Sequence, residues 1–202
     1  MPDFSIEKKI NGIVAGVDEA GRGSWAGPVV AAAVIFEKES NYQFIKRIND
    51  SKKLSAKTRN ALYIDIVRFA FVGIGQATVK EIDSLNILKA THLAMRRAVE
   101  ELSTIPNVAL VDGNSSPCLD LPTKLIIKGD SISTSIAAAS IVAKVSRDQE
   151  MVKQAKYFPA YGFDSHKGYG TKMHMHALEK FGPSLIHRKS FRPVKNYYAN
   201  IC

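Results

Sequence analysis

"AGVDEAGRGSWAGPVV" occupies residues 15–30 and joins two apolar segments through a run of glycines. The apolar residues on either side predict two strands, and Asp18 and Glu19 lie at the end of the first one. Carboxylates are rarely buried unless they are paired or bind a metal. An acidic doublet at the tip of a buried strand therefore has no structural purpose of its own. The glycines from Gly21 to Gly27 permit a tight, irregular connection between the strands. We expect a functional site at this end of the first strand.

Outward from this stretch, apolar periodicity predicts five strands and three helices. The strands are expected at 12–19, 28–36, 71–79, 107–113 and 123–130. The helices are expected at 55–70, 83–103 and 131–155. The fifth strand repeats the pattern of the fourth, an apolar buried segment that ends in an acid. Strands and helices in mixed order imply an α/β layer fold.

The three helices differ in what their sequences predict. Helix 55–70 has Ser55 as an N-cap residue, because a serine hydroxyl can accept a bond from the first free amides. Helix 131–155 contains the small residues 137–140, which allow close packing on a sheet. Helix 83–103 is strongly amphipathic. Its expected apolar stripe consists of Leu85, Leu88, Leu93 and Val99.

The length of 202 residues is that of one large domain. No repeat, low-complexity tract or interdomain linker stands out. We expect a single domain over residues 1–202. Its catalytic core spans about 1–155, and a basic loop with a helical C-terminal part follows at about 156–202. After residue 155 we expect a loop rich in Gly, Tyr and Lys, and then a short helix.

Composition excludes several classes of protein. A hydrophobic fraction of 46% is ordinary for a globular protein and argues against intrinsic disorder. The N-terminus lacks a signal-peptide pattern, and no apolar run reaches the length of a membrane span. The two cysteines, Cys118 and Cys202, have neither metal-ligand nor disulfide-framework spacing. We expect free thiols in a cytoplasmic protein with no membrane association.

The charge of the chain is unevenly distributed. The net charge is +9, from 28 Lys and Arg against 19 Asp and Glu. Residues 144–202 hold 11 of the basic and 4 of the acidic residues, a net +7, so the first 143 residues carry +2. A basic C-terminal third favours a polyanionic partner such as nucleic acid. A solvated basic surface without a partner explains the same excess.

Three predicted strands end in acids, which are Asp18 with Glu19, Asp112, and Asp130. If these ends lie together, four carboxylates meet in one cleft and need compensation by cations. Oxygen ligands without His or Cys favour Mg²⁺ or Mn²⁺ and disfavour zinc. Two such ions are the usual apparatus for in-line phosphoryl displacement. Taken singly, Asp130 could cap the following helix and Asp112 could serve a turn.

Six motifs occur in order between residues 15 and 193. They are "AGVDEAGRGSWAGPVVAAAV", "DSKKLS", "VDGN", "KGDSISTSIAAASIVAKVSRD", "YGFDSHKGYGT" and "HRKSFRP". Together they resemble bacterial ribonuclease HII over almost the whole chain. The resemblance implies a ribonuclease H-like mixed β-sheet flanked by helices, with a C-terminal helical extension.

The resemblance also implies an activity and a metal site. The family hydrolyses the RNA strand of RNA–DNA hybrids and nicks duplex DNA on the 5′ side of a single ribonucleotide, as in ribonucleotide excision repair. The products are a 3′-OH and a 5′-phosphate, and the partners are RNA–DNA hybrid duplexes and DNA that contains ribonucleotides. The four metal-binding acids of the family correspond to Asp18, Glu19, Asp112 and Asp130. We expect two Mg²⁺ or Mn²⁺ ions and a monomeric enzyme.

Substrate contacts are implied in the same way. The Gly-Arg-Gly motif of the family corresponds to Gly21, Arg22 and Gly23, whose backbone contacts the 2′-OH that distinguishes RNA from DNA. Glycines allow such an approach, although they would also serve an ordinary turn. A family tyrosine that packs on the sugar of the next nucleotide corresponds to Tyr169. Spacing alone leaves Tyr161 as a competitor.

Basic residues supply further candidates for phosphate contacts. Lys52 and Lys53 in "DSKKLS" are expected near a phosphate, or they form a solvated basic pair before a helix. The remaining candidates are Lys144, Arg147, Lys167, Arg188 and Lys189.

Other residues are assigned no catalytic role. His174 and His176 are two apart, so on a helix they point in different directions and are poor joint metal ligands. His166 and His187 lie beside basic residues and could approach nucleic acid. Trp25 is expected to pack in the glycine-rich turn. Asp148 resembles a conspicuous family position in "KVSRD", and an ion pair with Lys144 four residues earlier explains it equally well.

Two other functions compete with this interpretation. A structure-specific DNA nuclease would use the same metal chemistry without the 2′-OH contact. A non-catalytic nucleic-acid-binding module would explain the basic C-terminal third but not the acids. The acidic doublet itself also poses a geometric question. On a regular strand, Asp18 and Glu19 point to opposite faces. Asp18 is therefore expected to bridge the ions, with Glu19 reaching them through a distorted strand end, its backbone carbonyl or a bound water.

Overall fold

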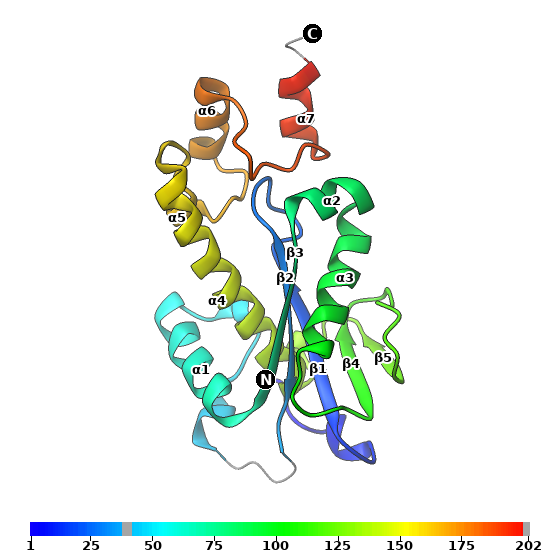
Figure 1. Ribbon diagram of the computed structural model, residues 1–202. Coiled ribbons are helices and arrows are strands. Elements are labelled where there is room, and N and C mark those ends of the chain that lie inside the picture. The colour runs from blue at the N-terminus through cyan, green and yellow to red at the C-terminus, as the bar shows by residue number, and fades with distance from the viewer. Residues whose placement is uncertain (38–41, 200–202) are drawn as a thin grey trace.

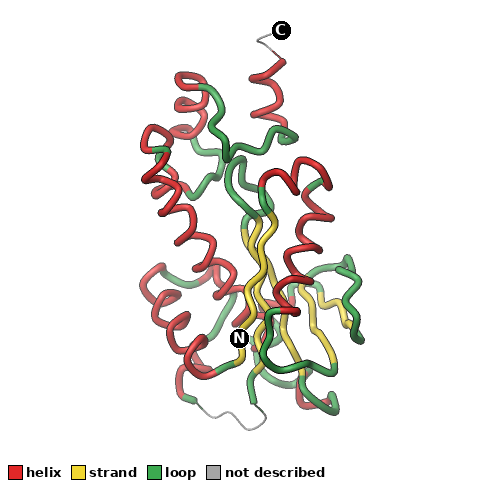
Figure 2. Tube along the Cα trace, in the orientation of Figure 1, coloured by secondary structure: helices red, strands yellow, loops and turns green. Residues whose placement is uncertain are grey.

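The protein, described by a computed structural model over residues 1–37 and 42–199, is built on one five-stranded sheet with helices on both faces (Figures 1 and 2). The order of the strands is β3-β2-β1-β4-β5. Their bounds are Val14–Ala20 for β1, Val29–Ile35 for β2, Phe71–Ala77 for β3, Val108–Asp112 for β4 and Thr123–Ile126 for β5. β2 runs antiparallel to β1 and β3, whereas β1, β4 and β5 run parallel. The predicted mixed α/β sheet is confirmed.

Helices cover the two faces of the sheet. Helices α1 (Ala56–Phe69) and α4 (Thr134–Tyr157) pack together, and α4 crosses β1 and β2 on one face. Helices α2 (Val79–Leu85) and α3 (Ile87–Glu100) lie on the other face, where α3 contacts β2 and β3 (Figure 1). β1 is therefore buried on both faces, which explains why its sequence is almost continuously apolar.

Alternation along β2 separates the two apolar layers of the core. Ala31 and Ala33 pack with α3, and Ala32 and Val34 pack with α1 and α4. The small residues of α4 let it lie close to the sheet, as predicted. A Cβ at Gly16 of β1 would come within 2.1 Å of the backbone of Ser135. Close contact between α4 and β1 thus depends on the small residues of α4 and on Gly16 of β1.

Helix 83–103 was predicted as one element, and this prediction is wrong. The chain forms two helices that meet at Asn86, whose φ of 72° is incompatible with a continuous helix. The side chain of Asn86 instead accepts bonds from the amides of Leu88 and Lys89 and caps α3. Half of the expected apolar stripe is confirmed, because Leu93 and Val99 pack against the core and are partly buried. Leu85 and Leu88 are 37% and 39% exposed, and the buried residues of α3 are Ala90, Thr91, Ala94, Met95 and Ala98.

The expected strand 123–130 also differs. β5 ends at Ile126 and forms an exposed edge of the sheet rather than a buried strand. Lys128 then adopts a left-handed conformation, and Asp130 lies on the 3₁₀ helix Gly129–Ser131 that precedes α4. The N-cap of α4 is Ser133, not Asp130. An acid does follow this apolar segment, but Asp130 lies on a 3₁₀ helix and not on the strand.

The C-terminal part consists of short helices beyond one end of the sheet (Figure 1). They are the 3₁₀ helix Pro159–Tyr161, α5 (Phe163–His166), α6 (Lys172–Phe181) and α7 (Arg192–Ala199). Helix α4 runs without interruption from the core into this part, so no structural break occurs at residue 155. In the described residues, no helix is long and apolar enough to cross a membrane. Cys118 is free and exposed, and Cys202 lies outside the described residues.

Candidate active site

Asp18 and Asp112 lie side by side at the ends of two neighbouring strands. The parallel register pairs Val17 of β1 with Val111 of β4, and each acid follows directly. Strand alternation places both on the face covered by α4, where Leu110 packs on Ile136. The first two predicted site residues therefore meet because β1 and β4 are parallel and adjacent.

Asp130 reaches the same place through the turn before α4. It is 7% exposed, and the amide of the adjacent Gly129 donates a 2.6 Å bond to Oδ1 of Asp112. Burial raises the pKa of Asp130, and the charges of Asp50 and Asp112 raise it further. Asp50 was not among the residues that the sequence pointed to, although it begins the "DSKKLS" motif.

Glu19 alternates with Asp18 along β1, so its side chain leaves the strand on the opposite face but still interacts with the carboxylates of Asp18 and Asp112. β1 stays regular through Ala20, with Glu19 paired to Ala31, so a distorted strand end does not bring the side chain in. The Glu19 carboxylate instead forms a 3.3 Å ion pair with Arg22, and its amide donates a 2.7 Å bond to Oδ1 of Asp18. Burial raises the pKa of Glu19, Arg22 opposes this effect, and Asp112 adds to it.

Asp18 is the most constrained member of the group. Burial raises its pKa well above the usual range, and the charges of Glu19 and Asp112 raise it further. Hydrogen bonds from Ser140 and from the Glu19 amide oppose this rise. Ser140 lies on α4 and also bonds to Ser51 at 2.9 Å. The ionised form of Asp18 thus calls for a nearby cation.

Lys52 supplies part of the positive charge. Burial lowers the pKa of Lys52, but surrounding carboxylates outweigh that effect and raise it. They are Asp130, Asp18, Asp50 and Asp112. Nζ of Lys53 lies 3.5 Å from the hydroxyl of Ser131 and 3.9 Å from Asp50. The "DSKKLS" segment therefore borders the acidic cluster, and its contact with a phosphate stays a prediction.

The ligands that the acidic cluster offers to a metal are all carboxylates. Four carboxylates without His or Cys are the ligands that Mg²⁺ and Mn²⁺ prefer. Across residues 1–37 and 42–199, no three His, Cys, Asp or Glu side chains stand close enough to form a ready-made metal site. The chemistry of the group fits hard divalent cations, and Glu19 is held by Arg22 instead.

The Gly-Arg-Gly turn contains two glycines with different roles. Gly21 has a φ of +96°, and a Cβ there would lie 1.9 Å from Nε of Arg147. Gly23 is exposed, its φ is not in the left-handed range, and a Cβ there would meet no atom within 4 Å. Internal packing therefore explains Gly21 but leaves Gly23 without a structural reason.

The structure separates the two candidate tyrosines. Tyr161 is 7% exposed, stacks on Phe163 at 5.3 Å and donates a 2.6 Å bond to the carbonyl of Gly182. Tyr169 is 37% exposed, and the Nζ of Lys144 lies 5.5 Å from its ring centroid. Of the two rings, that of Tyr169 is the exposed one.

Two expected phosphate contacts are contradicted. Arg147 and Arg188 are completely buried, and their guanidinium groups donate to backbone carbonyls. Lys144 is partly buried and pairs with Asp148 at 2.8 Å, as predicted for the aspartate. Lys167 is partly buried and Lys189 is exposed, so these two stay candidates.

The histidines form a buried cluster rather than a metal site. His166, His174 and His187 are buried, and His176 is exposed, so the predicted divergence of residues 174 and 176 is confirmed. Nε2 of His174 lies 3.0 Å from Nε2 of His187. The ring of Trp25 packs on His174 at 5.3 Å, which confirms its packing role.

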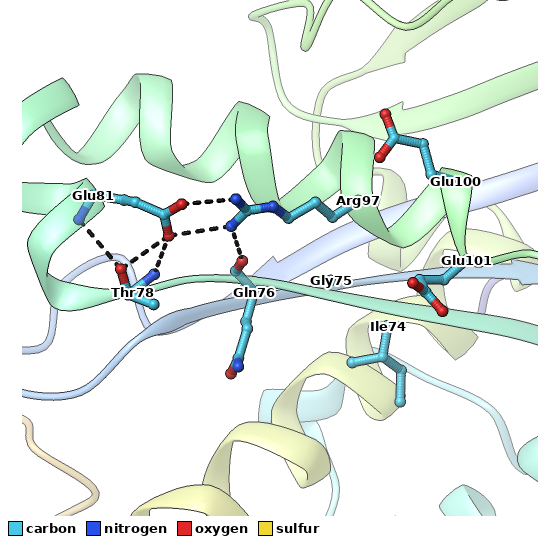
Figure 3. A pocket seen from close by; sticks show the side chains of 8 residues that line it. All are labelled: Ile74, Gly75, Gln76, Thr78, Glu81, Arg97, Glu100 and Glu101. Carbon is cyan, nitrogen blue, oxygen red and sulfur yellow. Dashed lines mark hydrogen bonds and ion pairs between the residues drawn. The ribbon is translucent and has the colours of Figure 1, made fainter.

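A pocket of about 430 Å³ lies elsewhere, between β3 and α3 (Figure 3). An ion pair between Arg97 and Glu81 borders it, together with Thr78 and Gln76. None of the acids of the candidate site lines this pocket. The candidate active site is therefore the acidic cluster and its turn, not this pocket.

Comparisons with known proteins identify the family of the chain. A family model described as Ribonuclease HII matches residues 15–194. The chain is 51% identical over 195 residues to a ribonuclease HII of Wolbachia sp. subsp. Brugia malayi (strain TRS), covering 96% of this chain and 95% of the relative. It is 52% identical over 194 residues to a ribonuclease HII of Jannaschia sp. (strain CCS1), covering 96% of each. The crystal structure of ribonuclease H2 from Pyrococcus horikoshii OT3 superposes with a TM-score of 0.76 at 25% identity, covering 93% of this chain and 98% of the other.

Proposed function

The chain belongs to the ribonuclease HII family, whose members cleave RNA in RNA–DNA hybrids, and from this premise we propose the finer details of its reaction. Family membership makes the chain a nuclease of the hydrolase class. Its specific task is to nick duplex DNA on the 5′ side of a single embedded ribonucleotide, leaving a 3′-OH and a 5′-phosphate.

The observation that carries this proposal is the meeting of acids at the ends of β1 and β4. Asp18 and Asp112 follow paired residues on parallel strands, and Asp130 joins them through the turn before α4. These three and Glu19 would hold two Mg²⁺ or Mn²⁺ ions. When bound, such ions activate the attacking water and stabilise the leaving oxygen.

The protein's own groups position the reaction. Ser140 and the amide of Glu19 orient the Asp18 carboxylate, and the amide of Gly129 orients Asp112. Lys52 points a positive charge into the cluster, where it attracts the phosphate of the substrate. Positioning and charge neutralisation are the contributions that phosphoryl transfer demands of a protein.

Recognition of the ribonucleotide is assigned to two features. The turn at Gly21, Arg22 and Gly23 offers its backbone to the 2′-OH, and the open space around Gly23 supports a close approach. The exposed ring of Tyr169 packs on the sugar of the next nucleotide and selects deoxyribose there. Lys53, Lys144, Lys167 and Lys189 are assigned to phosphates.

A duplex carrying one ribonucleotide tests the proposal. With Mg²⁺ or Mn²⁺ present, we expect one nick immediately 5′ of the ribonucleotide, and we expect chelation by EDTA to stop the reaction. Asp112→Asn should lower kcat by at least about 10³-fold, because metal-assisted charge stabilisation supplies several kcal/mol. The asparagine Oδ1 can still accept the bond from Gly129, so the melting temperature should change little.

Other outcomes would reject the proposal. A nick on the 3′ side of the ribonucleotide, or full activity of Asp112→Asn at saturating Mg²⁺, contradicts the assigned chemistry. Equal cutting of an all-DNA duplex would instead support a structure-specific DNA nuclease. Salt-dependent binding without turnover would support a binding module.

A further inference from the structure

Two arginines, Arg147 and Arg188, are completely buried between the core and the C-terminal part. Within the described part of the chain, neither guanidinium forms an ion pair. Burial, together with the nearby charge of Arg147, lowers the pKa of Arg188 to about 9. Burying a cation without a carboxylate is unfavourable, and apolar side chains are often more stable at such positions. Stability alone therefore does not explain two adjacent buried cations.

The donors of Arg188 all reach the turn that contains the Gly-Arg-Gly motif. Nε donates to the carbonyl of Gly27 at 2.9 Å, Nη1 to Arg22 at 2.9 Å and Nη2 to Pro28 at 3.1 Å. A guanidinium is planar and its donors have a fixed geometry. Arg188 therefore holds the two ends of the segment 22–28 at a defined separation.

Arg147 connects this turn to a second segment. Nε donates to the carbonyl of Pro28 at 3.0 Å, and Nη2 donates to Ala26 at 3.1 Å. Nη1 donates to the carbonyl of Lys167 at 3.0 Å, and the guanidinium carbon lies 5.5 Å from the ring centroid of Tyr169. One side chain thus contacts both segments to which recognition of the ribonucleotide is assigned.

The same side chain determines where the turn can lie. Arg147 occupies the space that a Cβ at Gly21 would need. Two backbone hydrogen bonds join the turn to the segments that contain Gly168 and Arg188. The amide of Trp25 donates to the carbonyl of Gly168 at 2.8 Å, and the amide of Arg188 donates to the carbonyl of Trp25 at 2.8 Å. Segments 22–28, 167–169 and 186–188 form one body around the two guanidinium groups.

We propose that Arg147 and Arg188 are positioning residues that set the distance between the Gly-Arg-Gly turn and the Tyr169 ring, and thereby the preference for a ribonucleotide followed by a deoxyribonucleotide. This inference rests on the proposed function, because it uses the assigned roles of the turn and of Tyr169. Neither arginine touches the substrate. Their effect is on selectivity, since an error of about 1 Å in position costs on the order of 10²-fold in rate.

The test compares two substrates in Arg147→Lys and Arg188→Lys. For each variant we measure kcat/KM on a duplex with one ribonucleotide and on a continuous RNA–DNA hybrid. Lysine keeps the charge but cannot span three carbonyls. We expect kcat/KM on the single-ribonucleotide duplex, divided by kcat/KM on the continuous hybrid, to fall at least about tenfold. The fall should come mainly from a lower kcat on the single-ribonucleotide duplex. A merely structural role would lower both values together and leave the ratio unchanged, which would overturn the proposal.

Arg97→Lys is the matched control. Arg97 also bridges a carbonyl and other acceptors, donating to Gln76 at 2.7 Å and to Glu81 at 2.7 Å and 3.1 Å (Figure 3). It lines the remote pocket and contacts neither recognition segment. Its variant should keep the substrate ratio within about twofold even if it loses stability.

Failure of this inference is distinguishable from failure of the proposed function. A wild-type enzyme that shows no preference for the ribonucleotide junction rejects the proposed function itself. A wild-type preference that both lysine variants retain rejects only the positioning role. If both variants fail to fold, hydrogen exchange in the wild type decides. Amides of 22–28 and 167–169 should exchange as one unit, and independent exchange of the two segments would overturn the proposal.

Discussion

Asp18 is 5% exposed, yet it shares its surroundings with the carboxylates of Glu19 and Asp112. Burial and like charge both disfavour its ionised form. The fold nevertheless orients it, through Ser140 of α4 and the amide of Glu19. Groups held in this unfavourable way are enriched at functional sites. The acidic doublet at the end of β1 is therefore a cost to stability that the proposed metal site would relieve.

The two glycines of the Gly-Arg-Gly turn allow a prediction at single-residue resolution. Gly23→Ala should fold with an unchanged melting temperature, because its Cβ would point into open space. The methyl group would stand between the backbone and an approaching sugar. We expect kcat/KM on a single-ribonucleotide duplex to fall at least about tenfold, an effect of one lost close contact.

Gly21→Ala provides the contrast. An alanine with a φ of +96° costs about 1–2 kcal/mol from backbone strain alone, and its Cβ would displace the buried Arg147. Urea denaturation should show this loss of unfolding free energy.

For Gly23→Ala, cleavage at the wild-type rate would exclude a close approach of the substrate at that residue.

At the scale of elements, the break between α2 and α3 shows how one residue overrides a pattern. Residues 83–103 have apolar side chains at helical spacing, which predicted a single helix. Asn86 ends α2 with a positive φ and caps α3 through two amides. Asparagine is a strong capping residue, and the two bonds of its side chain offset a backbone conformation (φ 72°, ψ 165°) that residues other than glycine rarely adopt. The signal was present in the sequence, but only tertiary packing decides whether an internal Asn caps or continues a helix.

The buried histidines form an element-scale support for Tyr169. Nδ1 of His187 accepts bonds from Ser184, so its proton lies on Nε2 and faces Nε2 of His174. Nδ1 of His174 then donates to the carbonyl of Tyr169 at 3.0 Å. Nδ1 of His166 accepts from the amide of Gly168 at 3.1 Å. This network requires neutral rings, because two protonated nitrogens would repel each other between His174 and His187.

The histidine cluster makes the stability of the protein dependent on pH. Burial, opposed by hydrogen bonds to the backbone and reinforced by the neighbouring rings, lowers the pKa of His174 and of His187 to about 4. Unfolded histidines titrate near 6.5, so the unfolded chain binds more protons between these values. Stability is full above about pH 6.5 and falls as the pH drops towards 4. Two such groups give a slope of about 2.7 kcal/mol per pH unit near pH 5.

Variants isolate this contribution from that of the carboxylates. Between pH 7 and pH 5, the unfolding free energy from urea denaturation should depend less steeply on pH in His174→Gln than in the wild type, by about 1.4 kcal/mol per pH unit for the one ring removed. His176→Gln removes an exposed ring and should keep the wild-type slope. A slope that responds to residue 176 but not to residue 174 would contradict the assignment.

At the scale of the whole molecule, the basic excess belongs to α4 and the C-terminal part. Residues 144–202 carry +7, and they include most of α4 and the helices beyond the sheet (Figure 1). The loops between those helices hold the Gly-Arg-Gly turn through Arg188 and present Tyr169. The basic excess and the ring proposed to contact the substrate thus belong to the same part of the chain.

The charge distribution predicts salt-dependent binding. The logarithm of the binding constant for duplex should fall linearly with the logarithm of salt concentration, by about 0.9 for each phosphate contact. Lys53→Ala should reduce the magnitude of this slope by about 0.9, since its Nζ borders the acidic cluster. Arg68→Ala is the control, because the end of α1 adjoins the start of β3, at the opposite end of the sheet from Asp18. Equal slopes in both variants would exclude Lys53 from the interface.

Much of the architecture was predictable because it depends on local pattern. β1, β2, β3 and β4 were found to within two residues, and Ser55 caps α1 as expected. β5 was overestimated, because an apolar segment at an exposed sheet edge has the same composition as a buried strand. The single-domain interpretation, the monomeric state and the cytoplasmic location stay predictions.

The sequence by itself determined the fold class, the family and the four acids of the candidate site, since periodicity and motifs are properties of neighbouring residues. Only the tertiary structure decided which charged and aromatic residues are available to a substrate. Arg147 looked like a phosphate ligand, yet it is buried against the carbonyl of Pro28, 119 positions away in the chain. Tyr169 and Tyr161 were equivalent by spacing, and packing on Phe163 buries only one of them. Burial depends on contacts between distant segments, and no local pattern records those contacts.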